Sequence, residues 1–394
     1  MKNIIILFKF LLMALNSKKS DASVIRNVHT ITFRLFSPEG GRGGGAAVQT
    51  CQNILLGNQY KKLQLKYSYF KDNIYTTGFP YHLSDLWLWG GALFAIETTK
   101  DEDGCVYITH DYGTGFGLAI LKKKFVYVAH LQGPRVEEKE NYNESMNMLD
   151  RLIIKFCERY VFKKALYVCF PSAGACDYYF NSNHRAIARS SACIGPVLYN
   201  TLYAHPVSQS VPSINLDPSV TTILSIGALT NAKGIDQIPY FFEKNLNKIE
   251  GRVRWIVVGQ GPQYSTINEH ALLIKRNNPN FDFIIIKSLS YPEICYLSNL
   301  CDVYLMLHRI SIFDLATLEA MEKGKCVVLS RVGGNVEFNK DDNIIFDDQF
   351  SELDVFNNNI IVDKGERNRV VYNEYFSNQD FIDSYHSVID DLCN

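Results

Sequence analysis

The sequence predicts an α/β protein built from two Rossmann-like domains, and three observations support this fold class. Its 394 residues correspond to between two and three domains of about 150 residues each. Short apolar runs alternate with helical stretches in both halves of the chain, which is typical of parallel sheets covered by helices. Between the halves, residues 195–220 contain four prolines and few charges, which predicts a domain boundary.

The individual strands are predicted from short apolar or alternating runs. Residues 29–36 alternate and end at Ser37-Pro38, so this strand is expected to enter a loop. Further strands of the first half are expected at 106–109, 125–129 and 167–170, with a helix at 150–162. In the second half, strands are expected at 222–226, 255–258, 283–286, 303–307 and 326–329. Each half therefore predicts its own doubly wound sheet.

Composition excludes several classes of protein. Forty Lys plus Arg against 41 Asp plus Glu leave a net charge of −1, so the overall basic charge typical of nucleic-acid-binding proteins is absent and any polyanion site must be local. No apolar run reaches the roughly 18 residues of a membrane-spanning helix. The ten cysteines are scattered without a C-x-x-C pair, which favours reduced core residues over a zinc site. These features predict a cytoplasmic protein.

The amino terminus permits two interpretations. Residues 4–15 are apolar apart from Lys9, and residues 1–36 hold six basic side chains and one acid, Asp21. This segment is either an interfacial anchor attracted to anionic lipid or the first buried element of the fold. Both interpretations stay open at the level of sequence.

A glycine-rich loop follows the first strand. Residues 37–48 read SPEGGRGGGAAV and include Gly44 and Gly45, and residues 46–56 are expected to form a helix. Glycines before a helix let a phosphate approach backbone N–H groups. The loop also fits the dinucleotide pattern G-x-G-x-x-A, but the acid expected about 20 residues later is missing.

The most specific segment lies in the second half. Residues Ser311 to Asp314 fit an S-x-x-D capping box, and the helix that follows is expected to end at Gly324. This helix starts just beyond the strand at 303–307, at the edge of the sheet where α/β proteins bind ligands. Glu319, about two turns into the helix, is either a ribose ligand or a solvated surface residue.

Here the residues carry a family resemblance. Residues 301–346 resemble the donor-site segment of family 4 glycosyltransferases, a large retaining family with the GT-B fold. Further segments resemble that family in the expected order: the glycine loop 37–48, HDYGTGFG at 110–117, VYVAHLQG at 126–133, FPS at 170–172, ILSIGALTNAKGID at 223–236, VVGQGP at 257–262 and a closing helix at 375–389.

The resemblance implies a domain organisation. Residues 1–205 are expected to form an acceptor-side domain and residues 206–374 a nucleotide-sugar donor domain, facing one another across a cleft. Residues 375–394 are expected to form a helix that crosses back to the first domain.

It also implies roles for individual residues. Lys233 would contact the donor diphosphate, Glu319 the ribose, and His130 the transferred sugar. The amides of Phe313, Asp314 and Leu315 would hold phosphate and sugar oxygens, and Gly44, Gly45 and Ser311 are further donor-binding candidates. Without the resemblance, Lys233 would be interpreted as a surface loop lysine and His130 as a half-buried structural histidine. A lysine and fixed N–H groups stabilise a departing diphosphate without a metal or cofactor.

Three positions depart from the family pattern. Ser311 stands where the family has a glutamate, Ala228 where an arginine is usual, and Asp314 where glycine is usual. These departures leave the sugar undefined, but they retain Lys233 and Glu319.

The sequence thus predicts a retaining enzyme that transfers a sugar from a nucleotide diphosphate to a glycan or lipid-linked glycan in cell-surface polysaccharide synthesis. The enzyme would be cytoplasmic and able to dock on the inner face of an anionic membrane through residues 1–20. Alternatives are a non-catalytic GT-B-like partner or chaperone, a nucleotide-sugar epimerase and an inverting transferase.

Overall fold

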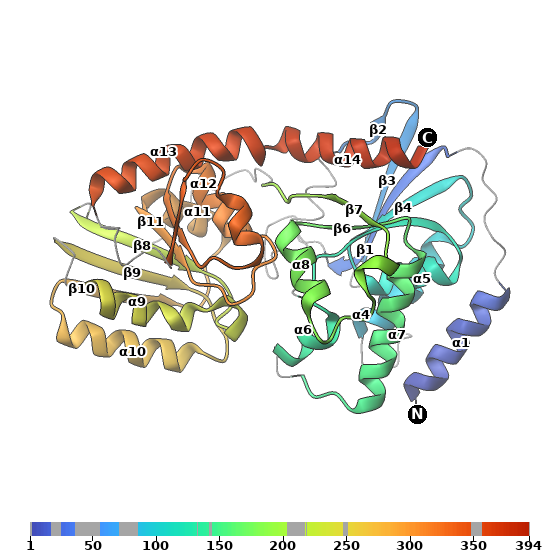
Figure 1. The fold of residues 1–394 in the computed structure, drawn as a ribbon, viewed down its shortest axis with the longest axis horizontal. Coiled ribbons are helices and arrows are strands. Elements are labelled where there is room, and N and C mark those ends of the chain that lie inside the picture. Colours follow the sequence, from blue (N-terminus) through green and yellow to red (C-terminus); the bar gives the residue numbers. More distant parts are fainter. Residues whose placement is uncertain are drawn as a thin grey trace. The chain divides into compact units, whose positions relative to one another are not determined.

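The computed structural model describes residues 2–16, 25–35, 56–70, 86–131, 133–141, 144–202, 217, 219–246, 251–347 and 357–393 (Figure 1). The chain divides into two compact units. The first unit comprises Met1–Tyr203 and Asn378–Asn394, and the second comprises Ala204–Ser377. The glycine loop and the helix expected at 46–56 lie outside the described residues, except for Leu56.

The first unit is built on a sheet in the order β2-β3-β1-β4-β5-β6-β7. Its strands are parallel apart from the antiparallel pair β2 and β3. They are β1 (Asn27–Leu35), β2 (Gln59–Tyr60), β3 (Leu63–Phe70), β4 (Cys105–Thr109), β5 (Lys124–Val128), β6 (Tyr167–Phe170) and β7 (Ile194–Val197).

Helices surround this sheet, and one of them comes from the end of the chain (Figure 1). They are α1 (Lys2–Asn16), α4 (Leu86–Thr99), α5 (Tyr112–Ile120), α6 (Arg135–Asn141), α7 (Met148–Lys164), α8 (Ala173–Asn181) and α14 (Asn378–Cys393). Phe381 and Tyr385 of α14 join the buried cluster that contains Val28 and Val126 of the sheet. The carboxyl-terminal helix is therefore part of the first unit's core.

Helix α5 is buried along its whole length because glycines let it approach its neighbours. A Cβ on Gly117 would lie 2.4 Å from the carbonyl oxygen of Ala92 in α4, so only glycine permits this contact. Asp111 caps the helix by accepting from the amide of Thr114, and it also accepts from the amide of Phe33 in β1 at 2.8 Å. The start of α5, and His110 before it, are thereby fixed to the sheet.

Helix α1 has one buried face and one exposed apolar face, so it has features of both interpretations of the amino terminus. Phe10 is 3% exposed and stacks on Trp89 at 5.6 Å between ring centroids. In the same helix, Phe8 is 61% and Leu15 78% exposed. The helix is thus packed on the first unit while it presents apolar side chains to the outside. Within the described residues, no helix is both long and apolar enough to cross a bilayer.

The second unit contains a fully parallel sheet in the order β10-β9-β8-β11-β12-β13. Its strands are β8 (Val220–Ile226), β9 (Arg252–Val258), β10 (Phe281–Ile286), β11 (Val303–Met306), β12 (Cys326–Leu329) and β13 (Ile344–Phe346). Its helices are α9 (Ile238–Asn245), α10 (Tyr264–Asn277), α11 (Tyr291–Leu300), α12 (Leu315–Glu322) and α13 (Asn358–Tyr375).

This strand order has a functional consequence. Numbered within the unit it is the Rossmann order 3-2-1-4-5-6, in which the chain reverses direction across the sheet between its first and fourth strands. Those strands are β8 and β11. The carboxyl ends of β8 and β11 are therefore where a doubly wound sheet binds a ligand. The predicted fold class and the predicted strands are confirmed in both units.

Candidate functional site

Two loops meet at the carboxyl edge of the second unit's sheet, one after β8 and one after β11. The amides of Arg309 and Ile310 both donate to the carbonyl oxygen of Ala232. The Arg309 guanidinium binds Asp236 through two contacts of 2.7 Å. This bidentate pair is the strong form of a charged hydrogen bond, so the two loops are held as one structure.

Lys233 is positioned by the glycine that follows it. Gly234 has a φ of +64°, the left-handed region that glycine adopts without strain. A Cβ at Gly234 would lie 1.8 Å from the carbonyl oxygen of Leu307. The lysine loop therefore packs directly on the end of β11, and the geometry requires glycine at position 234.

The ammonium group of Lys233 is paired with the carboxylate of Asp314. Lys233 Nζ donates to Asp314 Oδ1 at 2.6 Å, and the two side chains are 22% and 7% exposed. The other carboxylate oxygen accepts from the hydroxyl of Tyr304 at 3.0 Å and from the amide and hydroxyl of Thr317, each at 3.1 Å. Asp314 is thus the centre of a buried polar network.

The predicted capping box at Ser311 is wrong, because Asp314 itself is the N-cap of α12. Thr317 offers Asp314 two donors, its amide and its hydroxyl, so the helix begins at Leu315, later than predicted. Glu319 consequently lies in the second turn of α12. The Ser311 hydroxyl is buried and has no hydrogen-bond partner within the described part of the chain.

The electrostatics of Asp314 are set by its cationic neighbour. Burial alone would raise the pKa of this carboxyl, but Lys233 and His308 outweigh it and hold the pKa well below its usual range. His308 is buried behind the pair, with Nε2 at 3.5 Å from Asp314 Oδ1, and burial lowers the pKa of its imidazole. The carboxylate therefore stays ionised, and Lys233 is its main counterion.

Glu319 has the opposite environment. Burial raises the pKa of this carboxyl to about 7, an effect that Lys323 opposes and Asp314 reinforces. Its side chain makes no hydrogen bond or ion pair with any residue that the structure describes. A partly buried carboxylate without a protein donor is a free acceptor for ligand hydroxyl groups.

Backbone donors lie at the start of the same helix. Within the described residues, the amides of Leu315 and Ala316 in the first turn of α12 donate to no protein acceptor. Phe313 contributes packing through its ring, whose centroid lies 4.4 Å from that of Phe338. The amino end of α12 thus offers N–H groups and a positive dipole end within five residues of Glu319.

In the first unit, two histidines follow neighbouring strands. His110 comes after β4 and His130 after β5, both are buried, and His110 Nδ1 lies 3.2 Å from His130 Nε2. The predicted sugar-binding residue His130 is therefore at the carboxyl edge of its sheet and hydrogen-bonded to a second imidazole. Gly44 and Gly45 lie outside the described residues.

Sequence reasoning missed three members of the Asp314 network, Tyr304, His308 and Thr317. His308 carried a usable signal, because it is a polar residue directly after an apolar strand at the ligand-binding edge. Tyr304 carried none, since a tyrosine inside an apolar strand is most simply a core residue.

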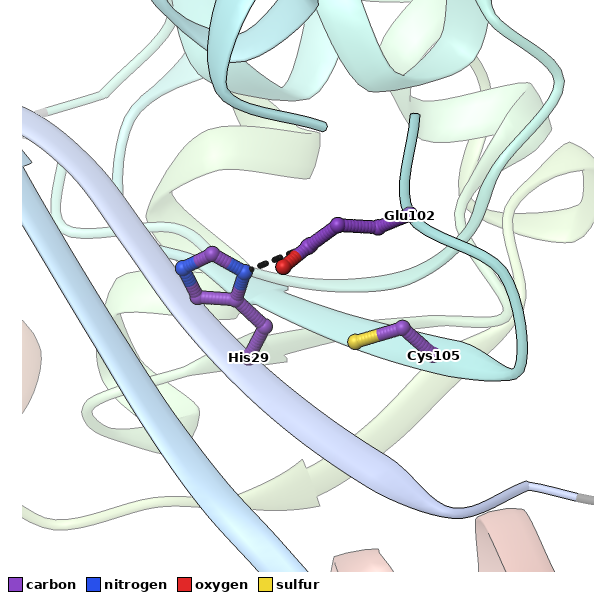
Figure 2. A group of neighbouring side chains, drawn as sticks. All are labelled: His29, Glu102 and Cys105. Carbon is purple, nitrogen blue, oxygen red and sulfur yellow. Dashed lines mark hydrogen bonds and ion pairs between the residues drawn. The ribbon is translucent and has the colours of Figure 1, made fainter. Parts of the chain in front are cut away.

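A separate group of side chains, His29, Glu102 and Cys105, lies at the amino edge of the first sheet (Figure 2). His29 Nδ1 bonds Glu102 Oε2 at 2.8 Å, and Nε2 bonds the hydroxyl of Ser68 at 2.9 Å. Burial, aided by Glu102, raises the pKa of the Cys105 thiol to about 12. With both ring nitrogens engaged and the thiol protonated, the group fits a hydrogen-bond network better than a metal centre.

Comparisons with known proteins identify one family and several similar folds. The model of the family described as glycosyl transferases group 1 matches residues 209–372. No curated protein matches the chain.

Several solved structures share the fold. Sucrose-phosphate synthase from Thermosynechococcus elongatus is 13% identical over 93% of this chain and 99% of its own, with a TM-score of 0.66. The trehalose-6-phosphate synthase OtsA is 13% identical over 93% of this chain and 98% of its own, with a TM-score of 0.64. HepE from Anabaena, solved in complex with UDP and glucose, is 14% identical over 93% of this chain and 100% of its own, with a TM-score of 0.60.

At such low identity these similarities establish the fold, and the family match lies within the second unit. The chain therefore has the GT-B fold, and its residues 209–372 match the group 1 glycosyltransferase family.

Proposed function

We propose that the protein is a retaining glycosyltransferase that moves a sugar from a nucleotide diphosphate to a hydroxyl group of a glycan or lipid-linked glycan. The observation that carries this proposal is the arrangement at the ends of β8 and β11. There, a lysine, the open amides of α12 and an unpartnered carboxylate lie at the ligand-binding edge of a Rossmann-like sheet.

Each group matches one part of such a donor. Lys233 and the amides at the start of α12 are suited to the diphosphate, whose negative charge grows as the sugar departs. Glu319 is suited to accept hydrogen bonds from the ribose hydroxyls because no donor among the described residues uses it. His130, held by His110, would hydrogen-bond the transferred sugar.

The expected chemistry relies on positioning and electrostatics. In the scheme usual for the family that the sequence resembles, no protein nucleophile is needed and the leaving phosphate helps to take the acceptor proton. Lys233 and fixed N–H groups would stabilise that leaving group without a metal or cofactor.

We further propose that the enzyme acts at the inner face of a membrane in cell-surface polysaccharide synthesis. The exposed side chains of Phe8, Leu12 and Leu15 in α1, next to the exposed Lys9, support docking on an anionic lipid surface. A lipid-linked acceptor would be presented at such a surface.

A donor screen tests the main proposal. The full chain is incubated with a panel of nucleotide sugars, and hydrolysis and transfer are scored by mass spectrometry. Lys233→Ala and Glu319→Ala should each lower turnover at least tenfold, about 1.4 kcal/mol of transition-state stabilisation. Lys275→Ala is the matched control, because Lys275 pairs with Asp282 away from α12. Near-normal turnover in both site variants would refute the assigned site.

Two alternatives are distinguished from this proposal by experiment. The serine at 311 and alanine at 228 favour a non-catalytic GT-B-like partner, which would bind no nucleoside diphosphate in a titration. An epimerase or an inverting transferase on the same fold would be recognised by NMR of the anomeric proton, in donor incubated alone or in the product.

A further inference from the structure

The lysine proposed to bind the donor diphosphate is already paired with a carboxylate of the same unit. Lys233 and Asp314 are in direct contact at 2.6 Å, so their charges cancel at the place where a dianionic group would bind. The nearby Arg309 guanidinium is held by both oxygens of Asp236, and Ala228 supplies no charge. A diphosphate entering this edge therefore finds a cation that is occupied.

The two partners of the pair are anchored very differently. Asp314 keeps three hydrogen bonds that do not involve Lys233, from Tyr304 and from the amide and hydroxyl of Thr317. The side chain of Lys233 is long and flexible. It is 22% exposed, whereas the side chain of Asp314 is 7% exposed. Gly227 lies beside that chain and has no side chain of its own. A Cβ at this position would lie 3.6 Å from Lys233 Cδ, so the glycine leaves space next to the lysine. The ammonium can leave while the carboxylate stays in place.

We propose that Asp314 is an internal competitor for Lys233. The ammonium leaves this carboxylate when a donor diphosphate binds and pairs with it again when the nucleoside diphosphate leaves. The inference rests on the proposed function of the site. This competition weakens the binding of both substrate and product. Asp314 therefore limits donor affinity and favours release of the nucleoside diphosphate. The residue is a determinant of affinity at this site and takes no part in bond making.

The variant Asp314→Asn tests the proposal in the full chain. Asparagine keeps the size of the side chain and is an equally good N-cap, so α12 keeps its start while the competing charge is removed. Binding of UDP, GDP and ADP is measured by titration calorimetry. The dissociation constant of the diphosphate that binds should fall at least tenfold, about 1.4 kcal/mol. Asp314→Ser, a second neutral N-cap, should show the same gain.

Two controls separate competition from a general effect of charge. Asp282→Asn removes another carboxylate of the second unit, one that pairs with Arg254 and Lys275, and should change the dissociation constant less than twofold. In the double variant Lys233→Ala with Asp314→Asn, the gain should disappear, because there is no ammonium to release.

The outcomes are distinct. If wild-type protein binds a diphosphate and both neutral variants bind it equally or more weakly, the competitor role is wrong and the proposed donor site stands. A gain that persists without Lys233 also overturns the inference. If neither wild type nor the variants bind any diphosphate, the inference and the proposed function fail together.

Discussion

Replacing Glu319 by glutamine should stabilise the folded protein above neutral pH while it weakens donor binding. The pKa of this carboxyl is raised from 4.5 to about 7 by burial. Between these two pH values the folded protein retains a proton that the unfolded chain has lost, so stability falls as pH rises through this window. Above pH 7 the whole penalty is present, and glutamine, which does not ionise, avoids it.

The magnitude follows from the width of that window. At about 1.36 kcal/mol for each pH unit, a pKa raised from 4.5 to about 7 corresponds to about 3.4 kcal/mol. Glu319 is only partly shielded from water, which reduces the penalty, so we expect Glu319→Gln to be about 1.5 to 3 kcal/mol more stable at pH 8. At pH 4 both proteins carry a neutral side chain and should differ by less than about 0.5 kcal/mol.

Urea unfolding at pH 4, 6 and 8 measures this difference, with Glu322→Gln as the control. Glu322 lies in the same helix but is 46% exposed, so its variant should follow wild type at every pH. Donor affinity should change with pH in the direction opposite to stability. Wild-type affinity should rise from pH 6 to pH 8 as Glu319 ionises, whereas the Glu319→Gln affinity should be lower and independent of pH. Equal stability of wild type and Glu319→Gln at pH 8 would show that the carboxylate is not desolvated and would refute the reasoning.

Two further predictions concern the frame of the site and the amino terminus. Gly234→Ala should cost more than about 1 kcal/mol in urea unfolding and weaken nucleotide binding, because its Cβ would meet the Leu307 carbonyl at 1.8 Å; unchanged stability would mean that the loop relaxes freely. The double variant Phe8→Asp with Leu15→Asp should lose sedimentation with anionic vesicles and keep its fold, since both side chains are largely exposed; retained sedimentation, or equal binding of wild type to neutral vesicles, would reject docking through α1.

The strands were predictable because each one is a local signal. The runs at 167–170 and 326–329 agree with β6 and β12 residue for residue, since buried parallel strands are short, apolar and bounded by turn residues. Lys233 and Glu319 were proposed as site residues through a pattern of several segments rather than through their own chemistry. The order of strands, and with it the reversal between β8 and β11, is a long-range property that short sequence patterns do not show.

Other features depend on contacts that sequence does not show. The start of α12 was misplaced because Ser311 and Asp314 are both good N-caps, and the choice between them is made by Thr317 and Tyr304. Similarly, the two histidines after β4 and β5 face each other because those strands are neighbours in the sheet, although the residues are 20 positions apart.

The two ion pairs between the lysine loop and the loop after β11 illustrate why pairing must be judged from geometry. Arg309 and Asp236 meet through two parallel hydrogen bonds, so separating them would break both at once, and this pair serves to join the loops. Lys233 and Asp314 meet through one bond, and among the described residues only the aspartate of this pair has other hydrogen-bond partners. Breaking that bond frees an ammonium without moving the backbone. The proposed diphosphate site would need a frame that stays fixed and a charge that can be released, and these two pairs match those two requirements.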